Sequence, residues 1–335
     1  MTRPNARRAL VTGGHGFLGS HLVDLLLERG YAVRCLLRPG RPETLLGGRP
    51  VEVVRGDIRA AQGLAAAVEG VDLVFHVAGL VAARSPAEFR DVNALGTGRL
   101  AAAVAARREG ACRFVLVSSQ AAIGPSPDGR PLTEERPPSP LTHYGTSKLL
   151  GELALAHAGI PFTVVRPPAI YGPRDRALLP FFRLAAWGLA PGLEGPGRRF
   201  NLLHARDVAA GILSAAEAEG ARGRAYFLSD GQGYGYGDVA QSMGRAFGLK
   251  PRRVPMPDCL LDLLAAFSDE ALGLLGRVPV FGRDKARELK ARWWLCSAER
   301  AQRELGWRPR VALDDGIRET AEWCVRTGLV RPRGP

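Results

Sequence analysis

Short apolar runs alternate with helical patterns over the first half of the chain. The runs cover residues 9–12, 32–37, 51–55, 72–77, 114–118 and 162–166. Between the first two runs, Leu18, Leu22 and Leu26 recur at the spacing of one face of a helix. This alternation of strands and helices predicts an α/β fold with a doubly wound parallel sheet.

The pattern changes after residue 168. Helical stretches at 178–188, 258–276 and 284–295 are no longer interleaved with regular strands, and prolines and glycines cluster between them. The chain of 335 residues is long enough for one large domain or two abutting ones. We therefore expect a smaller, mainly helical region after the sheet.

The chain is strongly basic, with a net charge of +13 at neutral pH. Its arginines are dispersed, and no stretch interleaves basic and aromatic residues, so we expect no nucleic-acid partner. A positive field of this kind would instead attract an anionic small molecule, or an acidic carrier that bears the substrate.

The five cysteines are scattered and show no C-x-x-C spacing. We therefore expect neither a disulfide framework nor a metal site. No apolar stretch reaches about 18 residues, and no signal-peptide core precedes the first strand-like run. These features predict a cytoplasmic protein without an integral membrane segment.

A glycine-rich turn joins the first strand-like run to the first helical pattern. Gly13 allows a tight turn, Gly16 lets the backbone approach a pyrophosphate, and Gly19 lets the helix lie close to the strand. The helix N-terminus then offers unpaired N–H groups and its positive dipole end to the phosphates. The alternative is a loop that only connects two elements, but the flanking strand and helix favour a dinucleotide site.

Tyr144 and Lys148 form the most informative pair in the chain. Only four of the 46 basic residues are lysine, and one of them lies four residues after a tyrosine. Lysine is a compact charge whose pKa its surroundings can move, whereas arginine keeps its proton. The strand-like run upstream ends in Ser118 and Ser119, and open α/β sheets place ligand chemistry at such strand ends.

Together these segments resemble the extended branch of the short-chain dehydrogenase/reductase superfamily, also called the NAD-dependent epimerase/dehydratase family. The resemblance covers nearly the whole chain and is nearest in pattern to dihydroflavonol reductases and 3β-hydroxysteroid dehydrogenases. It implies a Rossmann coenzyme domain over residues 1–168 and a substrate-binding region over residues 169–330, part of which returns to the sheet. A homodimer would be usual for the family.

The resemblance also assigns roles to individual residues. The implied catalytic set is Ser119, Tyr144 and Lys148. The implied coenzyme contacts are Gly13, Gly16, Phe17, Leu18, Gly19, Arg38, Asp57, Ile58, His76, Ala78, Gly79, Asn93, Lys148 and Pro167.

The chemistry of these residue types agrees with those roles. Hydride transfer at a carbinol carbon requires the oxygen's proton to move as well, so a phenol that ionises near neutral pH is useful. An ammonium one helical turn away is expected to lower the pKa of Tyr144. The family's pattern also has Lys148 bind the nicotinamide ribose, while Ser119 holds the substrate oxygen. The alternative for Ser119 is a backbone-capping hydroxyl, with Ser118 in its place; the spacing to Tyr144 favours Ser119.

The end of the second strand bears on the choice of coenzyme. An acidic residue there accepts the ribose 2′-hydroxyl of NAD, while an arginine accommodates the 2′-phosphate of NADP. Arg38 stands at this place, with Arg34 and Arg41 nearby and no carboxylate before Glu43. We expect NADP(H) as the coenzyme. NAD(H) is the alternative if Arg38 only faces solvent.

The substrate class rests on residue 200. In nucleotide-sugar members of the family, an arginine that binds the diphosphate precedes an aspartate by seven residues, and counting back from Asp207 reaches Phe200. Phenylalanine cannot form charge-assisted bonds to phosphate. Arg199 is adjacent, but a one-residue slip turns a strand side chain to the opposite face.

We therefore expect an NAD(P)-dependent oxidoreductase that acts on a relatively apolar ketone or secondary alcohol as its small-molecule substrate. Phe181, Phe182 and Trp187 would join Phe200 in an apolar lining, unless they belong to the core. The alternatives are a nucleotide-sugar epimerase or dehydratase and a non-catalytic dinucleotide-binding protein. The presence of the whole catalytic set argues against the latter.

Overall fold

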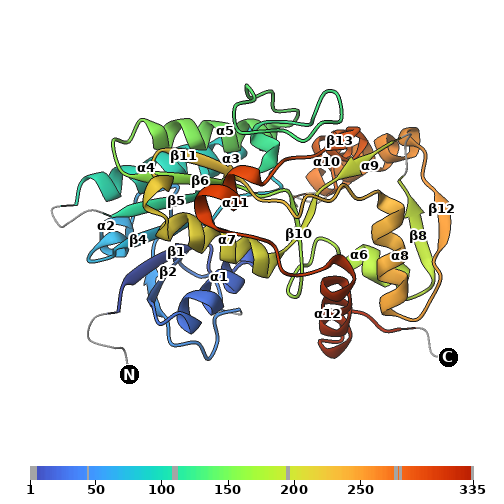
Figure 1. Ribbon diagram of the computed structural model, residues 1–335, viewed down its shortest axis with the longest axis horizontal. Coiled ribbons are helices and arrows are strands. Elements are labelled where there is room, and N and C mark those ends of the chain that lie inside the picture. Colours follow the sequence, from blue (N-terminus) through green and yellow to red (C-terminus); the bar gives the residue numbers. More distant parts are fainter. Residues whose placement is uncertain are drawn as a thin grey trace.

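The centre of the molecule is a seven-stranded parallel sheet (Figure 1). The computed structural model describes residues 6–43, 45–107, 112–193, 197–274, 278 and 281–332. The sheet strands are β1 (Arg8–Thr12), β2 (Ala32–Leu37), β3 (Glu52–Arg55), β4 (Leu73–His76), β5 (Arg113–Val117), β6 (Phe162–Arg166) and β11 (Arg224–Phe227). Their order is β11, β6, β5, β4, β1, β2, β3, which confirms the doubly wound α/β fold.

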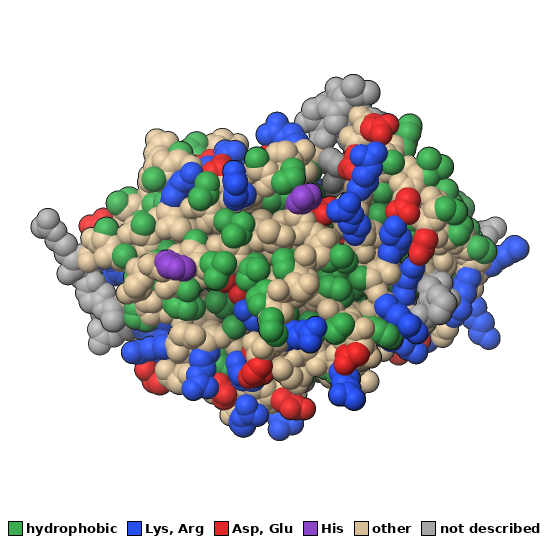
Figure 2. Space-filling view, turned by 90° about the horizontal axis from the view of Figure 1, so that it is seen from above, with side chains coloured by type: hydrophobic (Ala, Val, Ile, Leu, Met, Phe, Trp, Pro, Cys, Tyr) green, Lys and Arg blue, Asp and Glu red, His purple; other side chains and the backbone are tan. Residues whose placement is uncertain are grey.

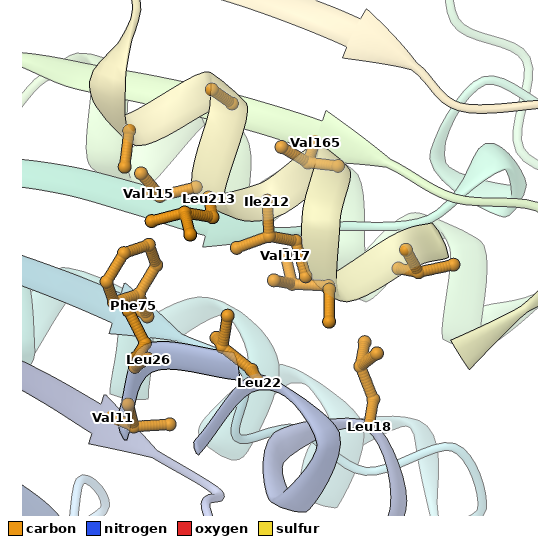
Figure 3. Close-up of a cluster of buried hydrophobic side chains, with 14 of the residues drawn as sticks. Val11, Leu18, Leu22, Leu26, Phe75, Val115, Val117, Val165, Ile212 and Leu213 are labelled. Carbon is orange, nitrogen blue, oxygen red and sulfur yellow. The ribbon is translucent and has the colours of Figure 1, made fainter. Parts of the chain in front are cut away.

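Helices cover both faces of this sheet. One face carries α1 (Phe17–Glu28), α7 (Ala205–Glu217) and α11 (Glu299–Leu305), and the other carries α2 (Leu64–Val68), α4 (Gly96–Ala105) and α5 (His143–Ala156). Leu22, Phe75 and Ile212 are fully buried between α1, the sheet and α7 (Figure 3). Burial of each such side chain contributes about 1.5–3 kcal/mol. The leucines that recur at helical spacing in the sequence therefore face the core.

The order of the strands reverses between β1 and β4, which are neighbours in the sheet. Thr12 at the end of β1 lies beside His76 at the end of β4, and His76 lies beside Leu116 in β5. The short segments α3 (Pro86–Phe89), η1 (Arg90–Leu95) and η2 (Gln120–Ala122) follow these strand ends. Such a reversal point is where open α/β sheets bind ligands.

The remaining elements form a second region at the right of Figure 1. Its helices are α6 (Leu179–Ala185), α8 (Tyr236–Ala246), α9 (Asp258–Leu274), α10 (Arg283–Lys290) and α12 (Leu313–Arg326). Its strands are β7 (Ala169–Tyr171), β8 (Leu189–Gly192), β9 (Arg199–Phe200), β10 (Leu202–His204), β12 (Arg252–Pro255) and β13 (Trp293–Trp294), paired as β10 with β7, β12 with β8 and β13 with β9. A short turn, η3 (Glu219–Ala221), precedes β11.

Two expectations for this region were wrong. Strands do alternate with its helices, and the helix expected over residues 284–295 ends at Lys290. Trp293 and Trp294 instead form β13, since large aromatic residues favour extended backbone and the partner strand β9 is available. The last two residues of the helix expected over 258–276 lie outside the described residues.

Within the described ranges, no helix is both long and apolar enough to cross a membrane. Lys and Arg side chains lie among acidic and apolar ones on the face that carries α5 and α10 (Figure 2).

Candidate active site

The glycine turn has the geometry that a pyrophosphate requires. Gly13 has a φ of +74°, and a Cβ there would lie 2.8 Å from the backbone nitrogen of Ala78. A Cβ on Gly19 would collide with the Gly13 carbonyl oxygen. The Gly16 N–H donates to Gly13 O at 2.9 Å, and Gly16 is the N-cap residue of α1, which has no side-chain cap. The N–H groups at the start of α1, beginning with Phe17, could donate hydrogen bonds to phosphate oxygens. The turn therefore fits the pyrophosphate of a dinucleotide.

A buried histidine holds the adjacent strand ends together. His76 Nδ1 lies 2.7 Å from Thr12 Oγ1, and its Nε2 lies 3.1 Å from Thr97 Oγ1. Burial, followed by the charge of Lys148, lowers the pKa of His76 to about 3. The neutral ring therefore supports the turn at Ala78, whose N–H donates to Thr12 Oγ1 at 3.2 Å.

Asn93 fixes the second side of the turn. Its Nδ2 donates to Leu80 O and to Ser147 Oγ, each at 2.9 Å, and its Oδ1 accepts from the Leu80 N–H at 2.8 Å. Asn93 belongs to η1, a π-helical turn of the kind often found at functional sites. A Cβ on Gly79 would lie 3.0 Å from Asn93 Oδ1 and 3.6 Å from Lys148 Nζ, so glycine leaves room for the lysine.

The structure brings the three expected catalytic residues together. Tyr144 and Lys148 lie one turn apart on α5, and the side chain of Ser119 lies close enough to the Tyr144 phenol to influence its pKa. Lys148 Nζ donates to Val117 O at 2.7 Å. Ser119 Oγ also accepts from the Ala121 N–H at 3.1 Å, so the capping interaction coexists with the contact to tyrosine.

The expected lowering of the Tyr144 pKa was wrong for this structure. Burial raises the pKa of Tyr144 to about 12. The nearby Ser119 side chain opposes this rise, and the charge of Glu288 adds to it. Burial also lowers the pKa of Lys148 to about 8, against the attraction of Glu152. The sequence argument counted the nearby ammonium but not the desolvation of both groups.

A buried ion pair beneath the site escaped the sequence analysis. Arg166 Nη2 lies 2.6 Å from Glu152 Oε2, and Arg166 Nε donates to Oε1 at 3.1 Å. Ser118 Oγ donates to the same Oε1 at 2.5 Å, so Ser118 is engaged away from Tyr144. Glu152 follows Lys148 by one further turn of α5, and this spacing is the signal that could have revealed it.

Cationic groups gather at the end of β2. Burial lowers the pKa of His15, and the positive charges of Arg38 and Arg41 lower it further. The buried His15 Nδ1 has no hydrogen-bond partner within the described chain. Asp57 is held by Arg59, with Nη2 and Oδ2 2.7 Å apart. This hydrogen bond is the largest cause that lowers the pKa of Asp57.

The other expected coenzyme contacts occupy supporting positions. The side chain of Leu18 is buried in the core, and Ile58 packs beneath Gly96, where a Cβ would lie 3.0 Å from its Cδ1. Pro167 follows β6, and its carbonyl accepts from the Gln120 N–H at 2.9 Å.

A cavity of about 520 Å³ opens beside Tyr144. One wall comes from residues 81–86 and Phe89, and the other from Asp269 of α9 and the start of α10. Phe89 packs against the Tyr144 ring at a centroid distance of 6.1 Å. A molecule bound in this cavity would therefore contact Tyr144.

The expected apolar lining does not form. Phe182 is only 1% exposed and packs in the core between α6, α8 and α12, whereas Trp187 is 61% exposed. Phe181 and Phe200 pack against that same core. Helical spacing did not reveal which face of α6 turns inward, and the described residues around the cavity do not include these four.

Arg199 forms an ion pair with Asp238. Its Nη1 lies 2.8 Å from Asp238 Oδ2, and both side chains are about half exposed. Phe200 instead packs against Tyr236, with ring centroids 4.8 Å apart and the ring planes tilted by 40°.

Comparison with known proteins agrees with the fold. A family model described as "NAD dependent epimerase/dehydratase family" matches residues 9–228. The chain belongs to this family. Ceramide reductase of Caulobacter vibrioides is 35% identical over 95% of this chain and 94% of its own. Sterol-4-alpha-carboxylate 3-dehydrogenase, decarboxylating, of Bos taurus is 29% identical over 95% and 92%.

Among solved structures, gox2253 has a TM-score of 0.80 at 27% identity and covers 96% of this chain and 99% of its own. The protein is thus an extended short-chain dehydrogenase/reductase, an enzyme of an NAD-dependent family. Among the described residues, no group of three His, Cys, Asp or Glu side chains could hold a metal ion.

Proposed function

We propose that the protein interconverts a relatively apolar ketone and secondary alcohol by hydride transfer, using Ser119, Tyr144 and Lys148. The observation that carries this proposal is the contact of Ser119 with Tyr144 beside the cavity of about 520 Å³. A cavity of this size suits a small organic ligand. Relatives named for ceramide and for a sterol support an apolar substrate.

The residues have distinct tasks in this reaction. A nicotinamide coenzyme, when bound, supplies or takes the hydride. The high pKa of Tyr144 keeps its phenol protonated at neutral pH, so it can donate a proton to the carbonyl oxygen during reduction. Ser119 also donates to that oxygen as negative charge develops on it. The charge of Lys148 favours the phenolate that remains, and Tyr144 acts as the base in the reverse direction.

The two regions would divide the binding. Residues 1–168 would hold the coenzyme, with phosphates at the Gly13 to Gly19 turn and ribose at Lys148, and residues 169–330 would hold the substrate. The cationic end of β2, with Arg38 and Arg41 near His15, supports NADP(H) over NAD(H). The direct test compares kcat/KM for NADPH and NADH. An advantage for NADH would contradict this preference.

We further propose a cytoplasmic enzyme that forms a homodimer, as extended family members often do. All five cysteines lie within the described ranges and are free thiols, which agrees with a reducing compartment. Sedimentation of the purified protein tests the dimer.

The proposal is tested with a panel of ketones, sterols, acyl thioesters and nucleotide sugars. Coenzyme oxidation should be fastest with apolar ketones. Calorimetric titration of the coenzyme-loaded enzyme with UDP- and dTDP-sugars should show no micromolar binding. Micromolar binding that depends on Arg199 would instead support a nucleotide-sugar epimerase.

A further inference from the structure

The N-terminus of α5 is held by a carboxylate from a distant part of the chain. Asp284 Oδ1 accepts from the His143 N–H at 3.1 Å, and its Oδ2 accepts from the Tyr144 N–H at 3.2 Å. Thr142 Oγ1 accepts from the Gly145 N–H at 3.0 Å. The first three amides of α5 are thus all paired, two of them with a residue of α10.

These amides matter because the first N–H groups of a helix have no partner within the helix. A cap residue usually satisfies one of them, and a carboxylate there also faces the positive end of the helix dipole. Tyr144 is the second residue of α5, so it lies in the turn that would fray first. Asp284 therefore acts on the peptide group of the catalytic tyrosine itself.

Asp284 is itself held by the wall of the substrate cavity. The Arg283 N–H donates to Asp269 Oδ2 of α9 at 3.0 Å, which ties the start of α10 to α9. The other end of α10 is joined to α9 by Lys290 Nζ and Asp262 Oδ1, 2.6 Å apart. Both Asp269 and Asp284 line the cavity beside Tyr144.

We propose that Asp284 is a positioning residue, which fixes the first turn of α5 and couples the orientation of Tyr144 to the α9 and α10 wall of the cavity. This inference rests on the proposed function of Tyr144. A substrate that packs against this wall contacts the element that aims the phenol. Misplacement of a catalytic group by about 1 Å can cost as much as 10²-fold in rate.

Two variants and a matched control test the proposal. Asp284→Ala removes both acceptors, and Asp284→Asn keeps one oxygen. Asp238→Ala removes a carboxylate that accepts from the Gly235 N–H at the start of another helix, α8, and Asp238 does not line the described part of the cavity. We expect kcat to fall about tenfold or more in Asp284→Ala, and less in Asp284→Asn, because the phenol loses its fixed orientation. The control should stay within twofold, and the coenzyme Kd should not change in any of them.

Hydrogen exchange tests the positioning role of Asp284 independently of the reaction at Tyr144. In Asp284→Ala, the peptide over residues 142–148 should exchange faster than in the parent, while the central sheet remains protected. Parent-like kcat together with parent-like exchange would overturn the proposal. If Asp284→Ala does not fold, kcat and hydrogen exchange are measured on Asp284→Asn instead, and the same outcomes test the proposal. Full activity of Tyr144→Phe would overturn the proposed function instead, and the exchange result does not depend on turnover.

Discussion

The proposed coenzyme half and the proposed substrate half of the site contain ion pairs that differ in how exposed they are. Beneath the sheet edge, the side chains of Arg166 and Glu152 are 10% and 7% exposed and share two contacts. Beside the wall of the cavity, the side chains of Arg283 and Glu270 are 58% and 71% exposed. Buried pairs fix one geometry at a high cost of disruption, whereas exposed pairs are nearly neutral. We therefore expect the buried pair to hold the geometry beneath the proposed catalytic residues, while the exposed wall can vary with the substrate.

The largest expected effect breaks the buried pair. Glu152→Gln leaves Arg166 as an uncompensated buried charge, and we expect a loss of about 3 kcal/mol in the free energy of unfolding. Glu270→Gln at the exposed wall should cost less than about 1 kcal/mol. Urea titration measures both. Equal losses would remove the contrast between the regions.

A smaller effect concerns pH. Because the pKa of folded Lys148 is about 8, below the usual value of 10.5, the unfolded chain binds more protons between these values. Stability should therefore rise with pH above 8. Relative to Lys148→Met, the parent should gain roughly 2 kcal/mol between pH 8 and pH 10. Parallel stability curves for the two proteins would show that burial does not perturb this lysine.

The proposed coenzyme half is bordered by Arg38, whose side chain is half-buried. Arg38→Ala should lower kcat/KM for NADPH about tenfold, the loss of one charge-assisted contact, and change that for NADH little. Arg34 is the matched control, because its side chain is already bound to the carbonyls of Ala66, Ala67 and Glu69. A uniform decrease with both coenzymes would place Arg38 outside the 2′-phosphate site.

The smallest effect is expected at Arg199. Its bond to Asp238 is about half exposed, so Arg199→Ala should change stability by less than about 1 kcal/mol. Ketone turnover should stay within twofold, since Arg199 does not line the described part of the cavity. A large decrease in turnover would show that the substrate reaches β9.

The sequence could predict features that depend on local spacing, but not contacts between residues far apart in the chain. The Gly13 to Gly19 turn, Ser119, Tyr144 and Lys148 lie in short segments whose spacing is read directly, and helix periodicity placed Leu22 in the core. Asp284 reaches α5 across 140 positions, and no local pattern indicates such a contact. Likewise, the strand at Trp293–Trp294 exists because β9 is there to pair with it. The raised pKa of Tyr144 depends on burial, which spacing does not report.

Transfer of deuterium tests the central claim most directly. The enzyme is incubated with an apolar ketone from the panel and NADPH that carries deuterium at both hydrogen positions of the nicotinamide C4, and the alcohol is analysed by mass spectrometry. We predict deuterium at the carbinol carbon and a rate at least about 10²-fold lower in Tyr144→Phe, the scale of one positioned general acid. An alcohol without deuterium, or an unchanged rate in Tyr144→Phe, would contradict hydride transfer assisted by Tyr144.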